Sequence, residues 1–115
     1  MREIDKRRYP RVEIAWPVTV MTPYGPVGGT TQNLSVGGAC IRLAETPELE
    51  EVFRLILRPA EQLLLPATAE LVWSETFFGD TSISQDMGVY FKYIANDNVK
   101  FMNNAISRGI LRKNR

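Results

Sequence analysis

The chain has 115 residues, of which 44% are hydrophobic and 23% are charged, so one soluble globular domain with its own core is expected. It contains no histidine and a single cysteine, Cys40. This composition excludes an internal disulfide, the usual zinc sites and catalysis by a Ser-His or Cys-His pair. The sequence has no apolar run of roughly 20 residues, the length that spans a bilayer, and no secretory signal. We expect a cytoplasmic protein without membrane insertion.

Charge is distributed unevenly along the chain, although the formal net charge is only +1. Residues 1–11 carry five basic and two acidic side chains, a net of +3, and residues 108–115 carry four basic side chains, a net of +4. A net of −6 is therefore left on residues 12–107. Basic ends on an acidic body suit an anionic ligand, or else they are solvated tails.

Hydrophobic and polar residues alternate in several segments, which is the pattern of half-buried β-strands. Pro17 predicts an edge or a bulge in the first of these strands, because proline cannot donate to a strand ladder. The alternation also places Trp16 and Trp73 on apolar faces, so both are expected in the core. Strands are expected at about residues 12–21, 29–34, 39–43, 53–57, 63–74 and 87–93, with a turn at 22–29 and a loop at 77–86.

The hydrophobic period becomes helical in residues 96–115, where an apolar stripe includes Met102 and either Ala105 or Ile106. Asn96 or Asp97 is expected to cap this helix. No strand–helix–strand unit is present, so a parallel sheet is not expected. Six antiparallel strands close most economically into a small barrel, with the helix packed on it or across one mouth.

These elements predict an all-β fold with a C-terminal helix, built on a six-stranded antiparallel β-barrel. We assign residues 1–11 to a flexible basic arm and residues 12–95 to the barrel. Residues 96–115 form the C-terminal helix and the basic tail of the same domain.

The basic arm contains two arginines, Arg7 and Arg11, in an RxxxR pattern just before the first strand. Pro10 argues against a helix here, so the two guanidinium groups of an extended arm can curl around one ligand. A guanidinium group pairs bidentately with phosphate or with the O6/N7 edge of guanine, and it also stacks on bases. The pattern is weak evidence by itself because chance matches are frequent.

A polar, glycine-rich stretch lies between the second and third expected strands and contains Asn33, Ser35 and Gly38 in an NxSxxG pattern. Strand alternation aims Asn33 and Ser35 the same way, and their amide and hydroxyl groups make directional hydrogen bonds. Gly37 and Gly38 tolerate positive φ and allow another backbone or a flat ligand to approach closely. The alternative interpretation is an Asx or serine turn that needs glycine for its geometry.

The two motifs occur together, in this order, and the chain resembles the PilZ domain family, receptors for the bacterial second messenger cyclic di-GMP. "RRYPR" followed by "VEIAWPVTV" is similar to the arm and first strand of that family, and "TQNLSVGGACIRL" to its second and third strands. "AELVWSE" is similar to its long fifth strand, which often ends in tryptophan, and "MGVYFKYIANDNVKFMNNAI" to its closing strand and helix. The resemblance covers most of the chain.

The resemblance implies a six-stranded barrel whose ligand is cyclic di-GMP, with no further cofactor and no metal. It implies that Arg7 and Arg11 grip the nucleotide, that Asn33 and Ser35 read a guanine edge, and that Gly38 lets the base come close. Possible additional ligand-binding residues are Lys6, Arg8 and Gly37. The family's residue before RxxxR influences whether one nucleotide or a stacked pair is bound, and the cations Lys6 and Arg8 favour the stacked pair with its four negative charges.

The expected function is that of a receptor or adaptor: nucleotide binding orders the arm and changes a surface that a downstream effector protein recognises. One alternative is a PilZ-like interaction module that does not bind nucleotide. Another is a small barrel that binds single-stranded nucleic acid through its basic ends and aromatic residues, which the acidic body opposes. Catalysis is not expected, because the carboxylates of Glu48, Glu50 and Glu51 cluster in a polar connection where such groups are usually solvated. Cys40 is expected to be a small strand residue, and Arg42 to face solvent or approach the site.

Overall fold

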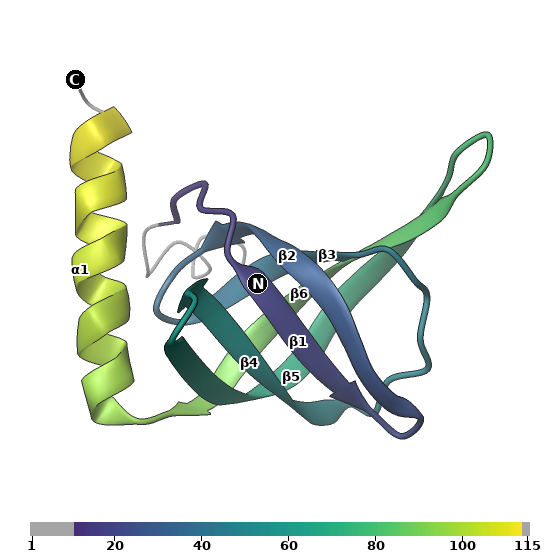
Figure 1. Ribbon diagram of the computed structural model, residues 1–115, viewed down its shortest axis with the longest axis horizontal. Helices are drawn as coiled ribbons and strands as arrows, with labels where there is room; N and C mark the ends of the chain where they lie inside the picture. Colours follow the sequence, from purple (N-terminus) through teal and green to yellow (C-terminus); the bar gives the residue numbers. More distant parts are fainter. Residues whose placement is uncertain (1–10, 114–115) are drawn as a thin grey trace.

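The computed structural model describes residues 11–113, which form six strands and one helix. All strand pairs are antiparallel, and the order β1-β2-β3-β6-β5-β4 closes on itself because β1 also pairs with β4. The predicted barrel and C-terminal helix are therefore confirmed (Figure 1). The elements are β1 (Pro17–Thr22), β2 (Gly25–Leu34), β3 (Gly38–Leu43), β4 (Val52–Ala60), β5 (Leu63–Phe78), β6 (Ile83–Ile94) and α1 (Asn96–Lys113).

The β1–β2 connection is tighter than the sequence predicts. β2 begins at Gly25, so the turn expected over 22–29 contains only two residues between the strands. Gly25 has a φ of 121°, which favours glycine, and its carbonyl accepts a 2.7 Å hydrogen bond from the Thr22 hydroxyl. Most of the stretch that reads as a turn by composition is therefore the first half of β2.

The β5–β6 hairpin is longer than predicted. β5 reaches Phe78 and β6 starts at Ile83, so the loop expected over 77–86 is reduced to the turn at 79–82, which the 2.7 Å bond from the Gly79 amide to the Ser82 carbonyl closes. Beyond the barrel the two strands continue as a twisted two-stranded ribbon, which projects at the upper right of Figure 1.

The strand predicted over residues 12–21 begins only at Pro17 in the structure, but residues 12–16 still lie beside the second half of β2. Buried Thr31 fastens this segment: its hydroxyl accepts a 2.8 Å bond from the Trp16 amide and donates to the Ile14 carbonyl. One isolated bridge, between Val12 and Leu34, completes the attachment. The alternation of this segment was predicted correctly, but the ladder is irregular: the Thr31 amide donates to the Trp16 carbonyl at 2.9 Å, and the Thr31 side chain bonds the segment between this contact and the Val12–Leu34 bridge.

Helix α1 closes one end of the molecule against residues 12–16 (Figure 1). Met102 and Ile106 are buried in the common core, as the predicted stripe requires, and the rings of Phe101 and Trp16 lie 6.1 Å apart. The amides of residues 98 and 99 both donate to the Ala95 carbonyl, so Ala95, and not Asn96 or Asp97, occupies the N-cap position of the helix. Within residues 11–113, no helix combines the length and apolar character that membrane crossing requires.

Candidate functional site

The hairpin topology brings the start of the described chain to the β2–β3 loop. The Val12 amide donates to the Leu34 carbonyl at 3.0 Å, and the Leu34 amide donates to the Val12 carbonyl at 2.9 Å. Arg11 is therefore held next to the loop that begins at Ser35, and its side chain is exposed. Burial raises the pKa of the Cys40 thiol and the positive charge of Arg11 opposes this shift, while Cys40 is the register partner of Asn33 on β3. Arg11 of the first motif thus lies close to the second motif.

Lys6, Arg7 and Arg8 lie outside the described residues. The same holds for the arm that we assigned to residues 1–11, apart from Arg11 itself. For these residues the sequence-based expectation stays a prediction.

Ser35 builds the loop between β2 and β3. Its hydroxyl oxygen accepts bonds of 3.1 Å from both the Gly37 and the Gly38 amides, and it lies 3.3 Å from the Gly38 carbonyl, to which the hydroxyl donates. The Ser35 amide also donates to that carbonyl at 2.9 Å, and the side chain is buried. The alternative interpretation, a serine turn, is therefore what the structure describes for this side chain.

Gly38 is needed because β6 passes very close. A Cβ atom on Gly38 would lie 2.2 Å from the Val89 carbonyl oxygen, so any side chain there would displace backbone. The neighbouring Gly37 carbonyl accepts a 2.8 Å bond from the Phe91 amide. Among residues 11–113, positive φ occurs at Gly25 alone, so Gly37 and Gly38 do not use that freedom. The role of Gly38 is close packing between strands.

Asn33 presents an unused acceptor. It follows a register shift in the β2–β3 ladder, between Thr31 and Asn33. Its side-chain oxygen Oδ1 is buried, and within the part of the chain that the structure describes it has no hydrogen-bond partner. Buried polar atoms are nearly always paired, because an unpaired one costs about 1–3 kcal/mol. The unpaired Oδ1 therefore makes Asn33, next to the β2–β3 loop, a candidate for a hydrogen bond from a donor that the described residues do not supply.

The face that carries Asn33 continues across three further strands. Asn33 pairs with Cys40 on β3, Cys40 with Gly88 on β6, and Gly88 with Trp73 on β5. The Trp73 indole lies directly over Gly88, where a Cβ atom would come within 2.1 Å of Nε1. With 43% of its surface exposed, this indole is an aromatic plate on the outer face of the barrel.

The prediction that Trp73 belongs to the core is wrong. The β5–β6 register shifts between Leu71 and Trp73, so Val72 is an extra residue in β5. Such a bulge reverses the alternation of every following side chain. Trp73 consequently points outward. Trp16, which does not follow such a shift, is buried as predicted.

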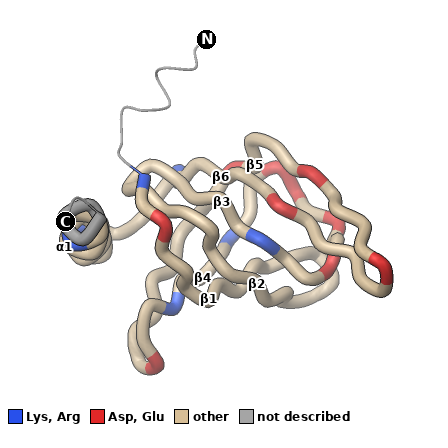
Figure 2. Tube along the Cα trace, turned by 90° about the horizontal axis from the view of Figure 1, so that it is seen from above, with Lys and Arg blue, Asp and Glu red and all other residues tan. Residues whose placement is uncertain are grey.

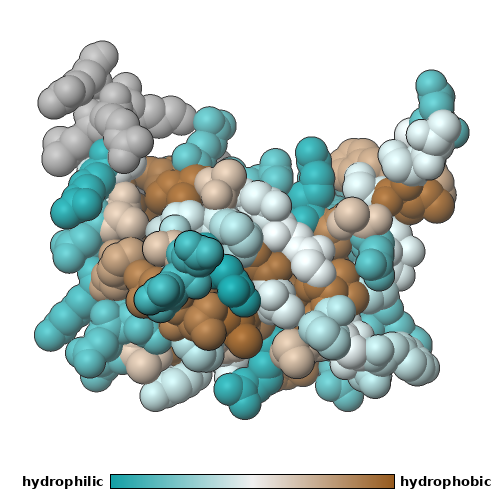
Figure 3. Space-filling model, in the orientation of Figure 1, coloured by the Kyte–Doolittle hydropathy of each residue, from teal (hydrophilic) through white to brown (hydrophobic). Residues whose placement is uncertain are grey.

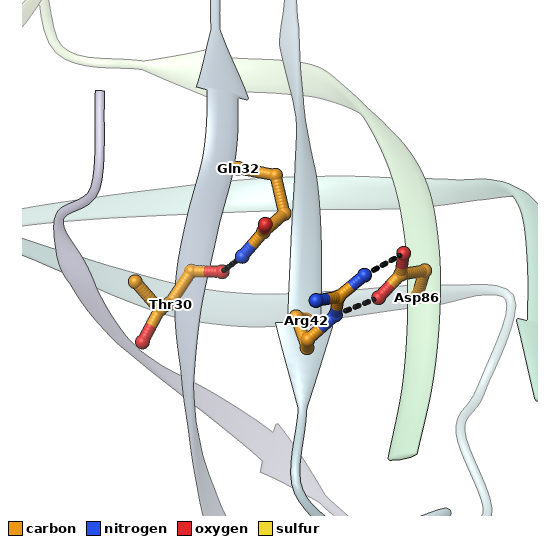
Figure 4. Close-up of polar contacts among 4 residues, drawn as sticks. All are labelled: Thr30, Gln32, Arg42 and Asp86. Atoms are coloured by element: carbon orange, nitrogen blue, oxygen red, sulfur yellow. Dashed lines mark hydrogen bonds and ion pairs between the residues drawn. The ribbon is translucent and has the colours of Figure 1, made fainter. Parts of the chain in front are cut away.

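Arg42 lies on the same outer face, one step along β3 from Cys40. Its Nε and Nη2 atoms donate to the two carboxylate oxygens of Asp86 at 2.7 and 2.9 Å (Figure 4). A hollow of about 580 Å³ lies beside it, between Thr30 and Gln32 on β2 and Ser84 on β6. This arginine is therefore close to the loop motif but already paired with a carboxylate.

Cys40 is partly buried in the middle of this face. Burial raises the pKa of its thiol and the carboxylate of Asp86 raises it further, while Arg11 and Arg42 lower it. The thiol is therefore protonated at neutral pH, in agreement with the prediction of a small strand residue rather than a reactive group. Within the described residues there is no cluster of three metal-ligating side chains.

Three residues of this face were not assigned to the site from sequence: Trp73, Gly88 and Cys40. The available signal was Gly88 in the middle of β6, because glycine inside a strand often marks a close approach. Arg42 was noted, but its partner Asp86 is 44 positions away and no local pattern connects the two.

Comparison with known proteins assigns the family. A family model described as the PilZ domain matches residues 5–107. The chain belongs to the PilZ domain family. PilZ domains are receptor domains rather than enzymes, which agrees with the expectation that the chain is not catalytic. No curated protein sequence matches the chain.

Solved PilZ structures share this fold at low sequence identity. MotI/DgrA, the inhibitor of motility of Bacillus subtilis, has a TM-score of 0.76 at 22% identity, over 100% of this chain and 55% of that one. The K. pneumonia MrkH-c-di-GMP complex has a TM-score of 0.77 at 17% identity, over 100% and 56%. The PilZ domain of YcgR from Escherichia coli with c-di-GMP has a TM-score of 0.70 at 15% identity, over 94% of each chain. Our chain thus spans about half the length of MotI/DgrA and MrkH, and it matches the YcgR domain throughout.

Proposed function

We propose that this PilZ domain is a receptor for cyclic di-GMP that acts as an adaptor in the cytoplasm. The observation that carries the proposal is the buried, unpartnered Oδ1 of Asn33 next to the Arg11 side of the β2–β3 loop. Guanine offers N–H donors on its edge, which such an acceptor requires, and the phosphates suit the arginine. Two of the structural neighbours, MrkH and the YcgR domain, are complexes with this nucleotide.

Each residue of the two motifs has a role in this proposal. Arg7 and Arg11 bind phosphate and guanine, and Asn33 accepts from a guanine edge. Ser35 and the glycines Gly37 and Gly38 act indirectly, because their hydrogen bonds fix the shape of the loop that follows Asn33. Lys6 and Arg8 are additional ligand-binding residues.

Trp73 adds an aromatic surface to this proposed site. Its exposed indole stands on the same row of side chains as Asn33, with Cys40 and Gly88 between them. A purine stacked on an aromatic side chain gains about 1–3 kcal/mol. We assign Trp73 to stacking with one guanine of the nucleotide. Asn33 accepts a hydrogen bond from the edge of the same guanine or of the second one.

The nucleotide is proposed to bind as a stacked pair, because the arm offers Lys6 and Arg8 in addition to the RxxxR arginines. Isothermal titration gives the stoichiometry directly, and we expect two nucleotides per chain. A value near one would overturn this part of the proposal and leave the receptor function intact.

Signalling is proposed to proceed through the arm. Binding across the barrel orders residues 1–11 and creates a composite surface of arm and nucleotide, which a downstream effector protein recognises. Hydrogen exchange of the arm amides is therefore expected to slow when nucleotide is added. Exchange that stays equally fast at saturation contradicts this mechanism.

The experiment that tests the site is calorimetric titration of cyclic di-GMP into the wild type and into Arg11→Ala and Asn33→Ala. Loss of a charge-assisted bond costs about 1.5–3 kcal/mol, so we expect Arg11→Ala to bind at least tenfold more weakly. Arg54→Ala removes an equally exposed arginine from β4 and is the matched control. If the wild type and Arg11→Ala give equal heats, the assignment of Arg11 to the nucleotide site is refuted. If the wild type gives no heat, an interaction module that does not bind nucleotide is favoured.

A further inference from the structure

The β5–β6 hairpin has an open strand edge outside the barrel. We call residues 72–84, which form its projecting part, the ribbon. On the β4 side, the ladder of β5 ends at Glu70, and one further bond of 2.9 Å joins the Leu71 amide to the Glu51 carbonyl. Beyond that point, among residues 11–113, β5 is paired with β6 alone. The backbone of residues 72–78 therefore offers its outer edge to solvent.

The ribbon also exposes large apolar side chains on both faces. Phe78 and Ile83 are opposite each other at its tip, with 78% and 47% of their surfaces exposed. Phe77 points to the other face and is 42% exposed. Figure 3 shows these brown atoms on the projection at the upper right. Soluble proteins usually protect a long apolar edge, because it recruits other chains.

The charge of the ribbon has one sign. Residues 72–84 include Glu75 and Asp80 and contain neither lysine nor arginine. Figure 2 shows that the acidic residues gather toward the end of the molecule that carries the ribbon, away from α1. An apolar edge with an acidic border matches a partner whose apolar residues are accompanied by cations.

We propose that the ribbon is a docking site for an extended, basic segment of another protein, which adds as a strand to the edge of β5. The open backbone requires an extended partner, the exposed aromatic residues require apolar contacts, and Glu75 and Asp80 require positive charge. A second copy of the ribbon fits poorly, because edge-to-edge pairing brings the acidic groups of both copies together.

The docking edge adjoins the proposed nucleotide site, because Trp73 belongs both to residues 72–78 and to the row of side chains that includes Asn33. Phe77 of the ribbon also lies near the outer face of the barrel: the Arg42 guanidinium, which pairs with Asp86, is 6.0 Å from the centre of its ring. The proposal itself needs no nucleotide, and it is tested without one.

A library of random linear peptides displayed on phage, selected against the full chain, tests the proposal. We expect the enriched peptides to alternate Lys or Arg with aliphatic or aromatic residues. A synthetic copy of such a peptide is expected to shift the amide resonances of residues 72–78. Its binding is expected to weaken at least about tenfold with Phe78→Ser and with Glu75→Lys.

Two exposed positions outside the ribbon provide matched controls. Tyr24→Ser removes an aromatic side chain that is 82% exposed in the β1–β2 turn, and Glu61→Lys reverses an exposed charge in the β4–β5 turn. Both are expected to bind the peptide like the wild type. Enrichment of acidic or neutral peptides, failure to enrich any peptide, or resonance shifts elsewhere overturns the proposal. A concentration-dependent dimer that Phe78→Ser abolishes also overturns it, in favour of a second copy as the occupant.

Discussion

Gly38 illustrates how one residue of a motif serves the fold before any ligand is present. β6 passes so close that a Cβ atom would lie 2.2 Å from the Val89 carbonyl oxygen, which is backbone and cannot rotate away. We expect Gly38→Ala to lower the free energy of unfolding by about 2–3 kcal/mol, the cost of forcing a methyl group into a packed site. Urea unfolding measures the change. Gly28→Ala is the control, because a Cβ atom there meets nothing within 4 Å, and equal losses in both variants contradict the argument.

Gly88 is expected to behave differently, although its contact is equally short. The obstacle is the Trp73 indole, which is a half-exposed side chain that can swing outward. Gly88→Ala should therefore cost about 1 kcal/mol or less in stability, yet displace the aromatic plate. In a Trp16→Phe background, tryptophan emission should shift to longer wavelength, and cyclic di-GMP should bind more weakly. Unchanged emission would show that the position of Trp73 does not depend on Gly88, and shifted emission with unchanged affinity would show that Trp73 has no part in binding.

At the scale of elements, alternation in the sequence predicted the six strands, their antiparallel pairing and the helix. It failed where the backbone departs from strict alternation. The extra residue at Val72 reversed Trp73, and no residue type at that position signals a bulge. The stretch over 77–86 reads as a loop because it is rich in Gly, Asp, Ser and Thr, but the ladder continues to the cross-strand pair of Phe78 and Ile83.

The candidate site was predictable in its parts and not in its arrangement. The RxxxR and NxSxxG patterns drew attention to Arg11 and Asn33, and the pairing of Val12 with Leu34 explains why these two parts of the chain lie close together. The sequence left two roles open for Ser35, because the same hydroxyl can bind a ligand or stabilise a turn; in the structure it accepts from the Gly37 and Gly38 amides of the turn. Arg42 and Asp86 form a pair that depends on the β3–β6 register, which is a property of the closed barrel.

Helix α1 gives a prediction at this same scale. Its fully buried Met102 joins the core that residues 12–16 complete, next to the Arg11 side of the candidate site. Met102→Ala is expected to lower the free energy of unfolding by about 2–5 kcal/mol through loss of contacts and a cavity. Thermal and urea denaturation measure the loss, and Asn104→Ala on the exposed side of the helix is the control. A loss no greater than that of the control would mean that α1 contributes little to holding this end of the barrel.

At the scale of the whole molecule, the barrel presents three surfaces. Helix α1 and residues 12–16 occupy one end, the ribbon projects from the other, and the outer face of β2, β3 and β6 lies between them (Figure 1). Closure of the sheet leaves few open edges, so the free edge on the ribbon is an exception to the rest of the barrel. Trp73 lies where the ribbon meets the outer face, so the two proposed binding surfaces adjoin at this residue.

The acidic body also decides which anions the molecule can bind. Residues 12–107 carry a net charge of −6, and an extended single strand must run over this surface once it leaves the basic ends. At the proposed site, a compact cyclic dinucleotide would meet only the arginines and the polar face around Asn33. We therefore expect labelled random single-stranded DNA not to bind at physiological salt, where polyanion binding is strongly weakened, while cyclic di-GMP still binds. Fluorescence anisotropy measures the first and calorimetry the second. Salt-sensitive binding of random strands that is tighter than nucleotide binding would identify the chain as a nucleic-acid-binding barrel instead, and unlabelled cyclic di-GMP added as competitor would show whether both ligands use the same face.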